Sequence, residues 1–158
     1  MKTKIMLLGL GVLLLGVAGC GKGTVEMKPG LWESRIVKME QDGKDMTESM
    51  NAMMARDPKA ARMCITKEMA SKMAANPPSN SSMPKLSQAG CEQPKINRSG
   101  NRTTVEIACN NVSTKTETVM ASDQVTTRAE VVMTMGGAKH TSVSETQMKF
   151  VSSDCSGN

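Results

Sequence analysis

The feature that most constrains the fold is a regular alternation of apolar and polar side chains in the second half of the chain. Val105 and Ile107 alternate with polar neighbours, and three later stretches repeat this two-residue period. Such a period places one set of side chains on each face of a strand. Turn residues interrupt it about every ten residues, as at Ser99-Gly100-Asn101 and Gly136-Gly137. We therefore expect strands joined by tight turns in an antiparallel meander.

The segment before this region carries a helical period instead. A first helix is expected from Asp45 to Arg56 or Asp57, with methionines along one side: Met46, Met50, Met53 and Met54. Asp45 with Glu48 three residues later fits a capping box. A second helix is expected from Thr66, as its N-cap, to Asn76. The polar and proline-rich residues from there to Gly90 predict an irregular connection, the part we most expect to be mobile.

Together these patterns predict an α+β domain, with an antiparallel sheet meander of five or six strands and one or two helices packed on one face. The expected strands are Leu31–Met39, Lys95–Arg98, Arg102–Cys109, Val112–Met120, Val125–Met135 and Thr146–Phe150. The chain has only one tryptophan and one phenylalanine but 16 methionines. Its core must therefore be filled largely by Met, Val, Ile and Ala, and methionine packs adaptably.

The N-terminus has the order of a secretory signal peptide. Lys2 and Lys4 precede an apolar run from Ile5 to Leu15, which is too short to span a bilayer. The following Gly16-Val17-Ala18-Gly19-Cys20 resembles the lipobox of bacterial lipoproteins. The resemblance implies that residues 1–19 are removed and that Cys20 carries the lipid. We expect residues 20–26 to be a flexible tether and residues 27–155 to be a single domain, attached to the periplasmic face of the outer membrane.

Four further cysteines, Cys64, Cys91, Cys109 and Cys155, are an even number in an exported chain and predict two disulfides. We expect Cys91–Cys109 to close a hairpin and Cys64–Cys155 to tie the helical segment to the last strand. A three-residue turn at 99–101 sets Cys91 opposite Cys109, whereas a two-residue turn pairs Ile96 with Val105 and leaves the cysteines one residue out of register. A bulge near Pro94 would satisfy both demands.

Several of these stretches are similar to one uncharacterised envelope family, the domain-of-unknown-function family 3617. They are Lys28-Pro29-Gly30-Leu31-Trp32-Glu33, Cys64-Ile65-Thr66-Lys67-Glu68, the Cys91 to Cys109 hairpin with its Ser99-Gly100-Asn101 turn, and Asp154-Cys155. The resemblance extends from about Glu26 to Cys155. It implies a secreted, often lipid-anchored, methionine-rich protein, and it implies no activity.

Residues that could carry chemistry are few. His140 is the only histidine, and its place after Gly136-Gly137 predicts a solvated turn. The methionines of the first helix could present thioethers to Cu(I) or Ag(I), although filling the core is the simpler interpretation. Met133-Thr134-Met135 is a weaker candidate, because it places only two sulfurs on one strand face.

Composition and motifs together favour a binding protein. The chain lacks a Gly-x-Ser-x-Gly elbow and a phosphate-binding glycine loop, which argues against the enzyme classes that use them. Its net charge of +5 comes from scattered residues without aromatic interleaving, so nucleic acid is not an expected partner. We expect a non-enzymatic module without a cofactor, attached to the membrane by its lipid, that binds a protein or small-molecule ligand. A soft-metal binder that uses Met46, Met50, Met53 and Met54 is the alternative.

Overall fold

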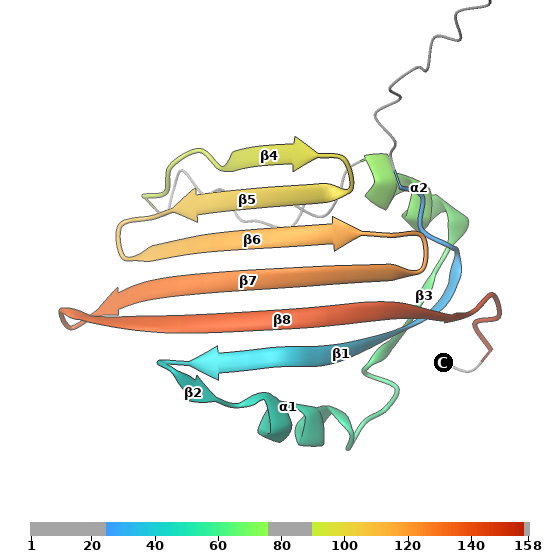
Figure 1. Ribbon diagram of the computed structural model, residues 1–158, viewed down its shortest axis with the longest axis horizontal. Coiled ribbons are helices and arrows are strands. Elements are labelled where there is room, and N and C mark those ends of the chain that lie inside the picture. Colours follow the sequence, from blue (N-terminus) through green and yellow to red (C-terminus); the bar gives the residue numbers. More distant parts are fainter. Residues whose placement is uncertain (1–24, 76–89, 157–158) are drawn as a thin grey trace, which may run out of the picture.

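The computed structural model describes residues 25–75 and 90–156, which form one large antiparallel sheet and two short helices (Figure 1). The sheet has the strand order β2-β1-β8-β7-β6-β5-β4. β2 pairs with the last residues of β1, and β3 pairs with its first residues. The strands are β1 Gly30–Gln41, β2 Lys44–Asp45, β3 Arg62–Ile65, β4 Lys95–Ser99, β5 Arg102–Ala108, β6 Val112–Met120, β7 Gln124–Met135 and β8 Ala138–Ser152. The helices are α1 Thr47–Met54 and α2 Lys67–Ala75.

The predicted α+β class is confirmed, but the expected number of strands was too low, since the described residues form eight. The two additional strands, β2 and β3, have two and four residues. Such short strands are too brief to show a two-residue period. They form by pairing with the edge of β1 that β8 does not occupy.

The last strand was also predicted too short. Gly136 and Gly137 alone make the turn, with φ values of 59° and 83°, so β8 begins at Ala138. His140 therefore lies within a strand, opposite Met133, and its predicted place in a turn was wrong. Two adjacent glycines with positive φ suit the twist of a two-residue hairpin.

The hairpin of β4 and β5 contains both of the residue pairings that the sequence predicted. A two-residue turn pairs Ser99 with Arg102 and Ile96 with Val105. Cys91 nevertheless lies opposite Cys109 and is bonded to it. The pairing shifts by one residue between Cys91 and the start of β4 at Lys95. This shift lies next to Pro94, where the bulge was expected. The second bond joins Cys64 to Cys155, so the two pairs are those expected.

The two helices take different positions relative to the sheet. α2 packs on a face through Ala70 and Met73, and the Thr66 hydroxyl caps it by accepting the Met69 N–H at 3.2 Å. α1 instead lies along the edge of β1, between β2 and β3 (Figure 1). The prediction that helices pack on one face therefore applies to α2 and is wrong for α1.

The start of α1 also differs from the expected capping box. Asp45 belongs to β2, and its carboxylate accepts the Thr47 N–H at 2.8 Å. Met46 occupies the N-cap position and makes no side-chain cap bond. Because Asp45 pairs with Glu40 in β1, the N-cap lies one residue later than the capping box predicted. The helix ends at Met54, before the predicted end at Arg56 or Asp57.

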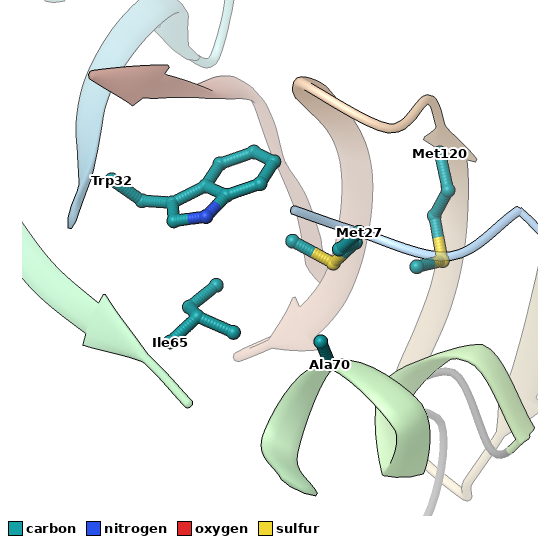
Figure 2. Packing of buried hydrophobic residues seen from close by; sticks show 5 residues of the cluster. All are labelled: Met27, Trp32, Ile65, Ala70 and Met120. Atoms are coloured by element: carbon teal, nitrogen blue, oxygen red, sulfur yellow. The ribbon is translucent and has the colours of Figure 1, made fainter. Parts of the chain in front are cut away.

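The core is small and lies at one end of the sheet, where α2 covers it. Figure 2 shows Trp32 facing Met27 and Ile65, with Ala70 of α2 and Met120 of β6 beside them. Trp32 and Ile65 are fully buried, and Phe150 meets the Trp32 ring edge-on at 6.0 Å between centroids. Methionines contribute a large share of this core, as the composition predicted.

Candidate functional site

The two faces of the sheet differ in chemistry. We call the face that bears Trp32, Met120 and Met148 the inner face, and the opposite one the outer face. The outer face carries cross-strand ion pairs: Arg102 with Glu117, Lys115 with Glu106 and Arg128 with Glu145. These side chains are exposed or half-buried, and ion pairs at the surface add little stability each. Opposite charges are matched across strands, which is typical of a solvated surface.

The middle of the inner face carries a different set of side chains, short hydroxyl-bearing and apolar ones. The strand registers place them side by side across β1, β8 and β7: Ile36, Met39, Thr146, Ser144, Ser142, Thr127, Ala129 and Val131. All of them are half-buried. Neither α1 nor α2, the two helices of the described residues, lies over this part (Figure 1). We call it the open inner face.

The edge of β1 next to this face is protected by side chains of α1. Asn51 Nδ2 donates to the Ile36 carbonyl oxygen at 2.9 Å, and the Met39 N–H donates to Thr47 Oγ1 at 2.9 Å. A shallow pocket between α1 and β1 is lined by Arg35, Ile36, Val37, Thr47 and Asn51. Because Asn51 and Thr47 of α1 bond to the backbone of β1 where no strand pairs with it, α1 functions as an edge cover.

His140 lies at the end of the sheet farthest from the core and has one defined partner. Its Nδ1 is 2.9 Å from Asp42 Oδ2, in the turn between β1 and β2. Asp42 is itself fixed, because its Oδ1 accepts the Thr141 N–H at 2.7 Å and its own N–H donates to the Thr141 carbonyl at 2.7 Å. The hydrogen bond from His140 and then that from Thr141 hold the pKa of Asp42 below its ordinary value. Sequence reasoning missed this pair, which joins residues 98 apart.

The methionines proposed as a soft-metal site do not form a buried stripe. Met46, Met50 and Met54 are half-buried, Met53 is 59% exposed, and α1 contains no buried residue. The expectation that they face the sheet as core was wrong, because α1 lies at an edge where only one side of it meets other atoms. Met46 also precedes the helix, so Met50, Met53 and Met54 remain together on it.

A different set of soft ligands is brought together by the hairpin of β7 and β8. Met133 lies directly opposite His140, and Met135 lies two residues further along the same face of β7. The signal for this was present in the sequence, because a two-residue turn at Gly136-Gly137 sets Met133 opposite His140. Because His140 was predicted to lie in a longer turn, its position opposite Met133 was not recognised.

Other predicted residues are placed as follows. Cys20 and most of the expected tether, together with residues 76–89 of the irregular connection, lie outside the described residues. Among the residues that the structure describes, no helix is long and apolar enough to cross a membrane. Within the same ranges, no three His, Cys, Asp or Glu side chains are grouped so that they could hold a metal ion.

The residues that carried the family resemblance have structural roles. Trp32 Nε1 donates to the Lys28 carbonyl at 2.9 Å and thereby orients the indole in the core. Gly30 has a φ of 141°, and a Cβ there would lie 2.2 Å from the Ser152 carbonyl oxygen, so only glycine fits where β1 meets β8. Cys64 and Cys155 covalently tie β3 to the C-terminal end of the described chain.

Comparison with known families agrees with this placement. A family model described as "Protein of unknown function (DUF3617)" matches residues 27–155. The chain belongs to this family. The match begins at the buried Met27 and ends at the disulfide-bonded Cys155, so it covers the sheet, the core and both disulfides of this DUF3617 chain. No curated protein and no solved structure matches the chain.

Proposed function

We propose that this DUF3617 chain is a non-enzymatic, lipid-anchored envelope protein that binds a ligand or partner protein across its open inner face. The observation that carries the proposal is the contrast between the two sheet faces. The outer face is charged and internally paired, whereas the open inner face mixes apolar and hydroxyl-bearing side chains and has neither described helix over it. A sheet face of this mixed kind normally packs against another layer.

The chemistry of the open inner face defines what it would bind. Ser142, Ser144 and Thr146 run along β8, with the apolar Ile36 and Ala129 on the strands to either side. Hydroxyls donate and accept hydrogen bonds, and the methyl and methionine groups between them favour apolar contact. The partner is therefore expected to be elongated and amphipathic, and aligned with the strands.

The binding half of the proposal can be tested with photo-crosslinking in whole cells. A photoreactive residue at Ser144 faces the open inner face, and the same residue at the neighbouring Glu145 faces outward, which gives a matched control. We expect a discrete crosslinked species from position 144 and none from position 145. Equal crosslinking at the two positions, or crosslinking from Glu145 alone, would contradict the proposal.

The anchoring half rests on the N-terminal lipobox pattern and is tested separately. Because several acyl chains hold a protein at a bilayer far better than one, the wild-type protein should remain in the membrane fraction. Cys20→Ser should either release the protein or leave its signal peptide uncut. A processed Cys20→Ser protein that stays membrane-bound after a high-salt wash would rule out the lipid anchor.

A further inference from the structure

The hairpin of β7 and β8 gathers three soft or borderline metal ligands on one face. Met133 pairs with His140 and Met135 with Ala138, and side chains at alternate positions share a face. Directly opposite residues have Cβ atoms about 5 Å apart, and diagonal neighbours are within reach of long side chains. The thioethers of Met133 and Met135 can therefore meet the imidazole of His140 at the end of the sheet.

The histidine is already oriented as a metal ligand. Its Nδ1–H donates to the Asp42 carboxylate at 2.9 Å, which leaves Nε2 as the atom with a free lone pair. Metal-binding histidines commonly donate their second ring N–H to a carboxylate, which fixes the tautomer and makes the ligating nitrogen more basic. Asp42 is held by two hydrogen bonds to the backbone of Thr141, so this arrangement is rigid.

The soft metal ligands available in the domain are the thioethers of its methionines. Cys64, Cys91, Cys109 and Cys155 are all bonded in disulfides, so none offers a thiolate. Thioether sulfur prefers soft ions, above all Cu(I), and imidazole also suits copper. Met135 is 58% exposed and the His140 side chain 40% exposed, so an ion can reach them, and Met133 between them is half-buried.

We propose that Met133, Met135 and His140 form a binding site for Cu(I), with Asp42 as the positioning residue that orients the imidazole. The site uses different residues from the open inner face, so it goes beyond the binding of an amphipathic partner and stands without it. It also replaces the α1 methionines as the preferred soft-metal ligands, because α1 has no imidazole beside its sulfurs. Binding requires no redox step, since the ion is taken up and released as Cu(I).

The test uses Ag(I), a redox-silent probe for Cu(I), with the full-length protein in detergent. His140 is the only histidine in the chain, so its imidazole proton signals are unique in an NMR spectrum. We expect these signals to shift and saturate with one equivalent of Ag(I). A competition titration with a chromophoric Cu(I) chelator under ascorbate then gives the affinity for copper itself.

Variants assign the ligands. Met133→Leu keeps most of the volume and removes the sulfur, so it should weaken Cu(I) binding at least tenfold with little change in melting temperature. The Met133→Leu/Met135→Leu double variant and His140→Gln should abolish binding. Asp42→Asn should weaken binding by roughly 10- to 100-fold, as loss of a carboxylate behind a ligand does.

The matched control is Met50→Leu, which makes the same chemical change on α1. It should leave Cu(I) affinity unchanged. Loss of affinity with Met50→Leu but not with Met133→Leu would assign the ion to α1 and overturn the proposal. The same conclusion follows if Ag(I) binds without moving the His140 signals, or if no binding survives competition with the chelator.

Discussion

Two methionines of this chain occupy opposite environments, and they test the core directly. Met27 is 2% exposed within the core and Met53 is 59% exposed on α1. Met27→Ala should lower the free energy of unfolding by roughly 2 to 5 kcal/mol, as buried large-to-small changes do. Met53→Ala should change it by less than about 0.5 kcal/mol. Denaturant unfolding of the two variants measures this difference, and similar losses would mean that the core is placed wrongly.

A second residue-scale prediction concerns the carboxylate of Asp154, which precedes the disulfide-bonded Cys155. The Ser156 hydroxyl donates to Asp154 Oδ2 at 2.6 Å and the Ser156 N–H donates to Oδ1 at 2.9 Å. These bonds hold the pKa of Asp154 below its ordinary value of 3.8. A lowered folded-state pKa gives stability that is present above pH 3.8 and is lost as the pH falls through the folded value.

The comparison of wild type with Asp154→Asn over a range of pH tests this sign. The wild type should melt at a higher temperature at neutral pH, and the two curves should converge as the carboxylate is protonated in acid. A difference that stays constant, or that grows toward low pH, would contradict the assignment of the lowered pKa to the Ser156 hydrogen bonds.

At the scale of elements, α1 is the part whose position follows least from the sequence. Its period indicates a helix, but a helix can cover an edge as well as a face, and only the length of β1 decides between them. β1 continues to Gln41 and turns directly into β2, so α1 starts beyond the sheet edge and cannot reach a face. The strands β5 and β6 could be predicted because their alternation extends over seven or more residues.

The edge role of α1 leads to a prediction about its polar side chains. Asn51→Ala removes the bond to the Ile36 carbonyl and should cost about 1 kcal/mol of unfolding free energy. Asn97→Ala on the exposed strand β4 makes the same change at a position with no such bond and should cost less than about 0.5 kcal/mol. Equal costs in thermal or denaturant unfolding would show that α1 does not act as a partner for β1.

For the whole molecule, the two disulfides should contribute unequally. Cys64–Cys155 spans 91 residues and Cys91–Cys109 spans 18. By loop entropy, removing both cysteines of the longer bridge should cost roughly 4.5 kcal/mol and of the shorter one roughly 3 kcal/mol. Unfolding of the two double-alanine variants measures the order, and peptide mapping without reduction checks the pairing. A Cys64–Cys91 peptide would contradict it.

Contacts within a hairpin could be predicted from the sequence, whereas contacts between distant strands could not. The Cys91–Cys109 pair was accessible because the hairpin and its turn are local. The pairing of Asp42 with His140 was not, because it depends on β1 and β8 lying side by side although they are far apart in sequence. The open inner face likewise emerges only when three strands are set in register.

If the open inner face binds a partner in the cell, native methionines reveal it without any substitution. Met39 lies on this face opposite Ser144, and Met53 lies on α1 at the edge. Brief oxidation followed by mass spectrometry gives the reactivity of each thioether in intact cells and in the purified protein. We predict that Met39 is less reactive in cells than in the purified protein while Met53 reacts equally in both. Equal reactivity of Met39 in the two settings would mean that no partner covers the open inner face in cells.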